Sequence, residues 1–240
     1  MEHNSSAMQT CLFARLGLTD YFEVWDVQKA LAGQRGEGSV TDTLLLLEHP
    51  HTYTLGRRGK LSDVLVDEAT LEEIGVKVCH VDRGGEVTYH GPGQIVGYPI
   101  VDVRPLGGPV EYVRTLEAVL INTMTDFGLE ARREDGLTGV WVGNDKIAAI
   151  GVKISQGIAT HGFALNVNTN LSYFQHIVPC GIQDMVITSM ERLLGRTVDL
   201  DEVAMCLVHY FGLLFRRTME EEAVGQLLDA EKWAFASSIG

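Results

Sequence analysis

The side chains best suited to covalent chemistry in this chain are its four cysteines, and one of them has a distinct setting. Cys180 lies between Pro179 and Gly181, a pair that favours a turn exposing the sulfur at the end of a strand. No C-x-x-C pair is present, which argues against a zinc ribbon or a dense disulfide framework. The others stand in apolar strand or helix contexts typical of buried small hydrophobes, and are Cys11, Cys79 and Cys206. Cys180 is therefore the candidate nucleophile.

A thiol nucleophile needs a neighbouring cation or base, because a free thiol with a pKa of about 8.5 is only a few per cent thiolate at neutral pH. The candidates in the same half of the chain are Lys146, Lys153 and His176. The two lysines are an odd number of residues apart, so a regular strand points them to opposite faces. Cysteine–histidine pairs are the commoner arrangement, but the residues alone leave the choice between Lys146 and His176 open.

Glycines and other small residues indicate where a ligand could bind. The segment 83–94 holds four glycines and a proline, and such a loop can present backbone N–H groups to a carbonyl or phosphate, with Arg83 as a cation beside them. Small residues on neighbouring predicted strands could line a slot for an extended alkyl chain, and are Ala148, Ala149, Gly151, Gly162 and Ala164. The same residue patterns also arise without a ligand, from tight strand connections in the glycine-rich segment and from close packing around the small residues. His49 and His51 have a chelating spacing, but without a third ligand near them we predict no metal site.

The elements that must position these residues follow from hydrophobic periodicity and turn signals. Helices are predicted over 19–32, with Thr19 as N-cap, over 67–74, over 109–127, from Thr188 to Gly195, and after Asp199. Strands are predicted over 43–47, 76–81, 86–90 and 94–101, and in a hairpin region over 139–167 that turns at 143–145. The hairpins imply antiparallel pairing, and the order is not strictly βαβ. We expect an α+β fold with a mixed, largely antiparallel central sheet flanked by helices.

Composition excludes several classes of protein. The chain of 240 residues is 45% hydrophobic and 21% charged, as expected for a folded globular protein. Its net charge of −13 disfavours nucleic acid as the main ligand. No apolar run is long enough to cross a membrane, and the N-terminus lacks the features of a signal peptide, so we expect a cytoplasmic protein. Basic residues nevertheless cluster locally, at Arg57, Arg58 and Lys60, at Arg132 and Arg133, and at Arg216 and Arg217.

Taken in order, several segments resemble lipoate-protein ligase B, the lipoyl (octanoyl) transferase family. They are Glu48-His-Pro50, Thr52-Tyr-Thr-Leu-Gly-Arg57, Arg83-Gly-Gly-Glu-Val-Thr-Tyr-His-Gly-Pro-Gly-Gln94, Gly139-Val-Trp-Val142, Lys146-Ile-Ala-Ala-Ile-Gly-Val152, His161-Gly-Phe-Ala-Leu-Asn-Val167 and Val178-Pro-Cys-Gly181. The similarity covers about residues 10 to 215. It implies one catalytic domain over 1–240, with a C-terminal helical extension at 216–240, and a fold similar to the catalytic domain of biotin and lipoate protein ligases.

The resemblance also implies an activity and the residues that carry it. The family transfers an octanoyl group from acyl carrier protein to a lysine of lipoyl domains, on the E2 subunits of 2-oxoacid dehydrogenases and on the H protein of glycine cleavage. By resemblance, Cys180 forms the acyl thioester and Lys146 is its acid–base partner, with no cofactor or ATP. The residues implied for substrate binding are Arg83, Gly84, Gly85, Glu86, Val87, Thr88, Tyr89, His90, Ala149, Ile150, Gly151, Gly162, Phe163 and Ala164.

Two residues depart from the family pattern, and two other functions compete with the transferase. Glu86 stands where glutamine is more usual, and His51 where a smaller or apolar residue is frequent.

An ATP-dependent lipoate or biotin ligase on the same fold would not need Cys180, and a binding module would hold a lipoyl domain or carrier without chemistry. Because acyl carrier proteins are acidic, we expect the cluster of Arg57, Arg58 and Lys60 to form the carrier-docking face.

Overall fold

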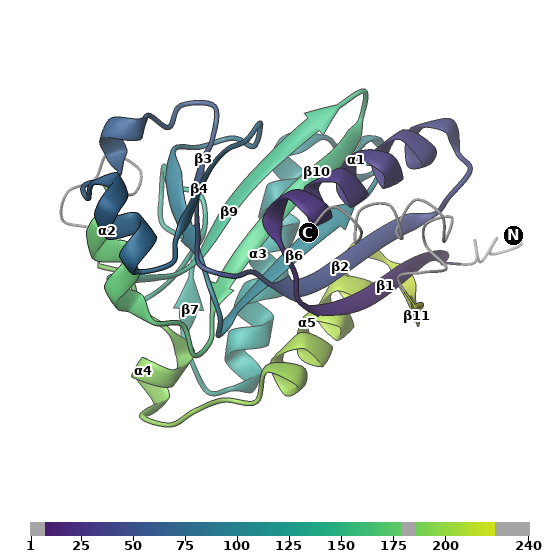
Figure 1. Ribbon diagram of the computed structural model, residues 1–240. Helices are drawn as coiled ribbons and strands as arrows, with labels where there is room; N and C mark the ends of the chain where they lie inside the picture. Colours follow the sequence, from purple (N-terminus) through teal and green to yellow (C-terminus); the bar gives the residue numbers. More distant parts are fainter. Residues whose placement is uncertain (1–7, 179–185, 224–240) are drawn as a thin grey trace, which may run out of the picture.

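The structure, a computed structural model, describes residues 8–178 and 186–223. Its largest element is an eight-stranded sheet in the order β11-β1-β2-β6-β10-β9-β8-β7 (Figure 1). The strands are β1 Gln9–Leu18, β2 Asp42–Glu48, β6 Gln94–Ile100, β7 Ala131–Arg132, β8 Val140–Val142, β9 Asp145–Ser155, β10 Ile158–Asn166 and β11 Arg217–Glu221. Among the described strands of this large sheet, the parallel pairings are those of β1 with β2 and with β11. The predicted mixed and largely antiparallel sheet is therefore confirmed.

Helices cover both faces of this sheet (Figure 1). Helix α1 (Tyr21–Glu37) lies on one face, while α3 (Pro109–Asp126) and α5 (Leu200–Phe215) pack together on the other. Each face has its own hydrophobic core, since the strand residues alternate between the two sides. Burying both faces explains why β2 reads as a continuous apolar run in the sequence.

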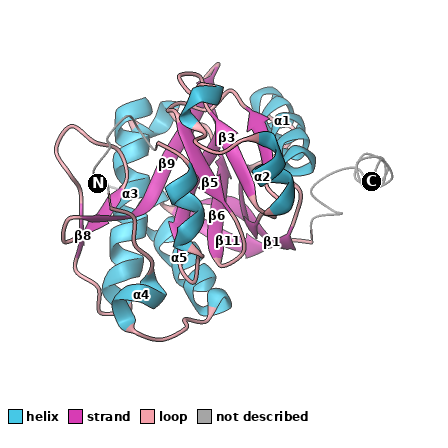
Figure 2. Ribbon diagram, turned by 60° about the vertical axis from the view of Figure 1, so that its left-hand side comes forward, coloured by secondary structure: helices cyan, strands magenta, loops and turns pink. Residues whose placement is uncertain are grey.

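A smaller sheet stands beside the large one and carries the glycine-rich segment. Its order is β4-β3-β5, with β3 at Thr52–Leu55, β4 at Lys77–His80 and β5 at Val87–His90. The short helix α2 (Glu68–Glu73) lies next to it, as Figure 2 shows. Strand β5 is followed by the turn that leads into β6, so one stretch of chain links the two sheets.

Several boundaries differ from the sequence predictions for identifiable reasons. Helix α1 begins after Asp20, whose carboxylate accepts from Phe22 N, in place of Thr19. The short helix α4 (Met190–Leu194) is capped by Ser189, not by Thr188. Strands β1 and β3 were not predicted as strands. The helical extension is wrong over 217–221, where β11 pairs with β1; residues 224–240 lie outside the described part of the chain.

Candidate active site

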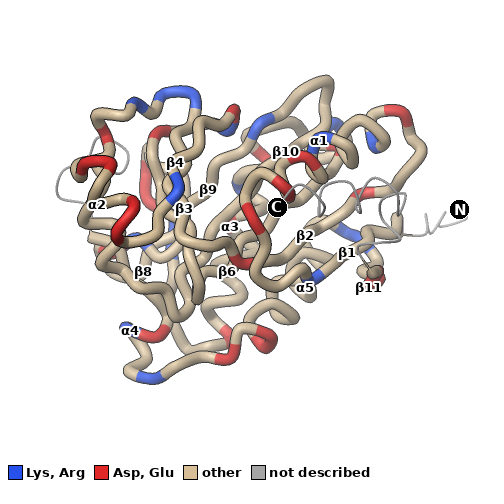
Figure 3. The backbone as a smooth tube through the Cα atoms, viewed as in Figure 1, with Lys and Arg blue, Asp and Glu red and all other residues tan. Residues whose placement is uncertain are grey.

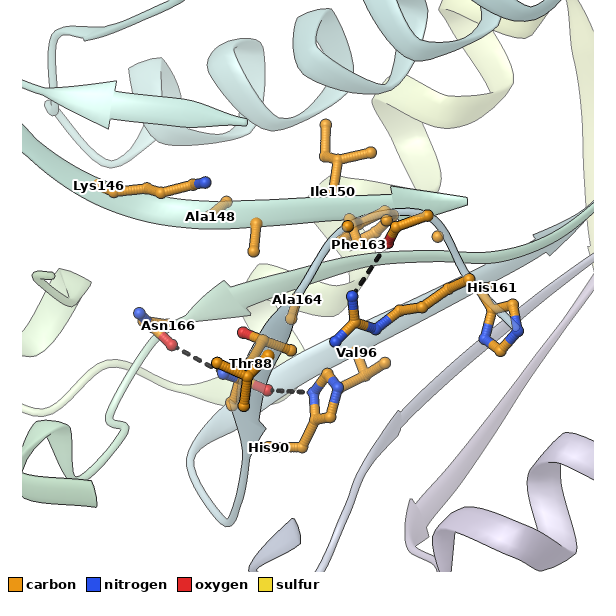
Figure 4. Close-up of a pocket in the computed structure, with 18 of the residues that line it drawn as sticks. Thr88, His90, Val96, Lys146, Ala148, Ile150, His161, Phe163, Ala164 and Asn166 are labelled. Carbon is orange, nitrogen blue, oxygen red and sulfur yellow. Dashed lines mark hydrogen bonds between the residues drawn. The ribbon is translucent and has the colours of Figure 1, made fainter. Parts of the chain in front are cut away.

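A pocket opens between the two sheets and brings together most of the predicted substrate-binding residues (Figure 4). We call it the central pocket. Its empty volume, counted out into the open mouth, is about 810 Å³. It is lined by Tyr21, Arg83, Gly84, Gly85, Glu86, Val87, Thr88, His90, Gln94, Val96, Tyr98, Lys146, Ala148, Ala149, Ile150, Gly151, His161, Gly162, Phe163, Ala164, Asn166, Phe174 and Ile187.

Lys146 stands at one end of this pocket, near the start of β9. Its side chain is only 7% exposed, and its Nζ lies 5.0 Å from the centroid of the Trp141 ring. Figure 4 shows the side chain running along β9 toward Ala148. Its backbone pairs with the segment that precedes α4: Lys146 N donates to Val186 O at 2.9 Å, and Lys146 O accepts from Thr188 N at 2.9 Å. The strand therefore fixes a buried amine at the pocket wall.

The space for this lysine is made by Gly139, which has a φ of +134°. Gly139 N donates to Oε1 of Glu117 at 3.3 Å. Glu117, on α3, is fully buried, and its other oxygen accepts from Arg114 at 2.7 Å and from Arg133 at 2.9 Å. Glu117 was not predicted as a residue of the site, because a lone glutamate in an amphipathic helix usually faces solvent.

Arg83 supports the glycine-rich loop from within. Its guanidinium donates to Thr54 O at 2.7 Å, to Thr54 Oγ1 at 2.8 Å, to Gly84 O at 3.0 Å and to Glu86 O at 2.9 Å. The expected cation beside the loop is therefore present, but many of its N–H donors are engaged in holding the backbone of the loop and of Thr54. The Glu86 carboxylate forms an ion pair with Arg58, with Oε1 3.7 Å from Nε.

A chain of polar side chains crosses the pocket from β5 to β10 (Figure 4). His90 Nδ1 is 2.8 Å from Gln94 Oε1, and Gln94 Nε2 donates to Asn166 Oδ1 at 2.9 Å. Asn166 Nδ2 in turn donates to Thr188 O at 3.0 Å. Full burial lowers the pKa of His90 well below the ordinary histidine value, so this imidazole is neutral at pH 7. This series of hydrogen bonds connects β5 of the small sheet, through β6 and β10 of the large sheet, to Thr188, whose backbone N donates to Lys146 O.

Tyr89 is the one predicted substrate-binding residue that does not line the central pocket. Alternation along β5 turns it to the other side of the small sheet, where its ring stacks on Tyr173 at 4.9 Å and its hydroxyl is 2.7 Å from His51 Nδ1. The three rings of His51, Tyr89 and Tyr173 form one stack. The unusual His51 therefore has a packing role in the structure.

The two alternative partners for the nucleophile lie elsewhere. Lys153 faces away from the central pocket, with its Nζ 2.6 Å from Asp82 Oδ2, which confirms the argument from strand alternation. His176 Nδ1 is 3.3 Å from the hydroxyl of Tyr53, in the small sheet. Among the predicted candidates, only Lys146 lines the central pocket.

Cys180 itself falls within 179–185, outside the described residues. The other cysteines have the unreactive settings expected from the sequence. Burial raises the pKa of Cys11 above the ordinary thiol value, and it raises the pKa of Cys79 and of Cys206 to about 11. None of these three is poised as a thiolate at neutral pH.

Comparison with known proteins now identifies the family. A model of the lipoyl protein ligase A/B catalytic domain matches residues 20–212, most of the chain. The chain belongs to the lipoyl protein ligase A/B catalytic domain family. An octanoyltransferase of Solibacter usitatus is 51% identical over 209 residues, which cover 87% of this chain and 94% of that protein. This member of the family is accordingly an acyltransferase.

Solved structures of lipoate and biotin ligases share the fold at low sequence identity. A lipoate-protein ligase A bound with ATP superposes with a TM-score of 0.72 at 16% identity, covering 96% of this chain and 95% of that chain. A biotin protein ligase of Aquifex aeolicus, in complex with biotin and ATP, has a TM-score of 0.53 at 12% identity, covering 87% and 71%. The expected likeness to lipoate and biotin ligases is confirmed at the level of the fold.

Within this family framework, some pocket residues were missed by sequence reasoning. Gln94 and Asn166 lie inside segments that carry the resemblance, but nothing in the residue pattern marked them as pocket residues. Tyr21 and Tyr98 follow the apolar phase of α1 and β6 and look like ordinary core residues. In the described residues, 8–178 and 186–223, no helix is long and apolar enough to cross a membrane.

Proposed function

We propose that this acyltransferase carries an octanoyl group from acyl carrier protein to a specific lysine of lipoyl domains, through a thioester on Cys180. One observation carries the proposal. The central pocket is a slot walled by small and apolar residues of β9 and β10, and it ends at the buried amine of Lys146. An extended alkyl chain needs such a slot, and an acyl transfer needs a proton carrier at the carbonyl end.

The described residues nearest Cys180 in the sequence support its place in this mechanism. Phe174 and Ile187 lie on either side of residues 179–185, and both line the central pocket. Val178 N donates to Asp63 O, and Val186 O accepts from Lys146 N, each at 2.9 Å. The chain thus leaves and returns close to the pocket that holds Lys146.

The first proposed step forms the acyl-enzyme. The Cys180 thiolate attacks the thioester carbonyl of octanoyl carrier protein, and the carrier thiolate leaves and takes up a proton. One thioester is exchanged for another, so the energy of the acyl bond is kept and neither ATP nor a metal is needed. Lys146, as a cation, favours the Cys180 thiolate before the attack and supplies the proton to the leaving thiolate.

The second step delivers the acyl group. The neutral amine of the target lysine attacks the Cys180 thioester, an amide bond forms, and the Cys180 thiolate leaves. The excess proton of the amine passes to Lys146, which was left neutral by the first step. The enzyme returns to its starting protonation state, and the products are free carrier thiol and octanoylated lipoyl domain.

The acidic carrier is proposed to dock on the basic loop, defined by Arg57, Arg58 and Lys60. All three are exposed, on the segment between β3 and α2, where Figure 3 shows Lys and Arg above an acidic α2. Backbone bonds join this loop to the pocket rim: Arg57 N donates to Arg83 O at 3.0 Å and Arg58 N to Gly85 O at 3.1 Å. A carrier held by this loop would present its acyl thioester at the pocket mouth.

Intact-mass analysis after mixing with octanoyl carrier protein, without ATP, tests the mechanism. We expect an octanoyl adduct that maps to Cys180, persists in Cys206→Ser and is absent from Cys180→Ser. Lys146→Met, which keeps the packing over Trp141, should form the adduct far more slowly. Undiminished transfer to a lipoyl domain by Cys180→Ser, or transfer that requires ATP, would instead favour a ligase. No adduct and no transfer would favour a binding module.

A further inference from the structure

His161 lines the central pocket at the end opposite Lys146. Figure 4 shows the two residues at opposite ends of the pocket, with Ala148 and Ala164 between them. His161 is paired with Val152 of β9, six residues along the strand from Lys146. At about 3.4 Å per residue, the two ends are about 20 Å apart.

Beyond His161 lies a second cavity, between α1 and the ends of β9 and β10. Its lining includes Gln28, Asp82 and Lys153, none of which lines the central pocket. His161 contacts this lining directly: Nε2 is 2.8 Å from Asp82 Oδ1, and its backbone N donates to Gln28 Oε1 at 2.7 Å. The imidazole and the Asp82 carboxylate are therefore the partition between the two cavities.

An unusual backbone conformation puts the imidazole there. Ala159 and Phe163 of β10 belong to the core under α3 and α5, and strand alternation would turn His161 to the same side. His161 instead has a φ of +55°, and its ring contacts Tyr21 of α1, with Nδ1 3.4 Å from the hydroxyl. A left-handed histidine in a strand is uncommon and persists only where its surroundings hold it. Here the bonds to Gln28 and Asp82 hold it across the pocket.

We propose that His161 is the residue that limits acyl chain length, by closing the far end of the central pocket. This inference rests on the proposed function for the identity of the acyl group. Of the about 20 Å between the two ends, an extended lysine side chain takes about 6 Å, the contact of its amine with the acyl carbonyl about 3 Å, and an octanoyl chain about 9 Å, so octanoyl nearly fills the space in front of the ring. A decanoyl chain is longer by two bonds, about 2.5 Å, and would collide with the imidazole.

The protonation state of His161 suits this task. Burial lowers the pKa of its imidazole, despite the hydrogen bond to Asp82, so the ring is neutral at pH 7 with Nε2–H donating to Asp82. Its exposed fraction is 1%. The apolar end of an acyl chain thus meets an uncharged ring edge, and the Asp82–Lys153 ion pair stays on the far side of the partition.

Chain-length competition tests the assignment. Octanoyl and decanoyl carrier proteins are supplied together, and the ratio of their kcat/KM values is measured for the wild type and for His161→Gly. Glycine keeps the left-handed backbone and its N–H, and removes the ring. We expect the decanoyl-to-octanoyl ratio to rise about tenfold or more, as two methylenes gain a buried place. An unchanged ratio in a folded His161→Gly protein overturns the inference.

Two further variants and one binding measurement complete the experiment. Ser155→Ala changes the lining of the second cavity but not that of the central pocket, so its ratio should stay at the wild-type value; a rise equal to that of His161→Gly would show general loosening and overturn the assignment. If His161→Gly does not fold, His161→Asn decides alone, because asparagine tolerates positive φ and is smaller. Calorimetric Kd values for octanoate and decanoate measure the chain-length preference without chemistry. An enzyme that transfers neither acyl chain refutes the proposed function, and the length limit is then judged from the two Kd values.

Discussion

A methyl group on Gly139 would stand 2.7 Å from Cε of Lys146, so the path of this lysine requires a residue without a side chain at position 139. The same methyl would lie 2.6 Å from the carbonyl oxygen of Ala148, which is fixed in β9. Gly139 also has a φ of +134°, which other residues rarely adopt. The geometry of the site therefore depends on a glycine that does not line the central pocket.

We predict that Gly139→Ala reduces octanoyl transfer about 100-fold, the effect expected of a displacement of about 1 Å at a catalytic group. The measurement is single-turnover formation of the acyl-enzyme. Gly143→Ala is the matched control, since it also has positive φ but has nothing within 4 Å of its added Cβ. It should lose about 1–2 kcal/mol of stability and keep its rate. Equal rates for the two variants would contradict the dependence of Lys146 on Gly139.

The buried Glu117 carboxylate is expected to stabilise the fold beneath this glycine. Glu117→Gln replaces the charged acceptor of Arg114 and Arg133 by a neutral amide, and we predict a loss of about 2 kcal/mol in the free energy of unfolding. Urea denaturation measures it. Glu130→Gln, at an exposed residue, should change stability by no more than about 0.5 kcal/mol. If Glu117→Gln lost no more free energy of unfolding than Glu130→Gln, the two ion pairs would make no net contribution to stability.

Acidification should destabilise the protein before its carboxylates titrate. Burial lowers the pKa of His49 to about 4 and that of His90 well below its ordinary value. Between pH 6.5 and 4 the unfolded chain therefore binds protons that the native protein does not, and stability falls as pH falls. His49 alone should cost about 3 kcal/mol by pH 4, from a shift of about 2.5 pH units.

The midpoint of thermal unfolding, followed from pH 7.5 to 4.5, tests this dependence. His49→Asn retains a donor toward Thr19 O, which now accepts from His49 Nδ1 at 2.7 Å, but it cannot titrate. The variant should start lower at pH 7.5 and have a shallower slope. Parallel curves for the two proteins would show that His49 does not contribute to the pH dependence.

Charge reversal in the basic loop should weaken carrier docking more than it slows the chemistry. For Arg57→Glu we predict a KM for octanoyl carrier protein at least about tenfold higher at low salt, with less difference at high salt. Transfer from a free octanoyl thioester should be unchanged. Arg216→Glu, at the far end of α5 near the opposite edge of the large sheet, serves as control. The same rise in both variants would point to net charge, not to a docking face.

The sequence was sufficient for the central strands of the large sheet (β2, β6, β8, β9 and β10), the long helices and the segments that meet at the central pocket, because these depend on local periodicity and on glycine placement. It could not place Tyr89, since a residue of β5 faces the pocket or the opposite side according to a register that the sequence does not reveal. It gave no sign that His161 departs from alternation, because the cause is tertiary contact with Gln28 and Asp82. Residues 217–221 form a strand only because β1 offers an edge.

That last pairing has a consequence for how the protein behaves in concentrated solution. The edges of the large sheet are β11, with the sequence Arg-Thr-Met-Glu-Glu221, and the two-residue strand β7. Strand β11 pairs with Gln9 to Phe13, the first half of the longer and more apolar β1, whose backbone there would otherwise be open to another chain. Short, charged edges resist strand addition between molecules. By covering β1, a segment remote from the site protects the sheet against edge-to-edge aggregation.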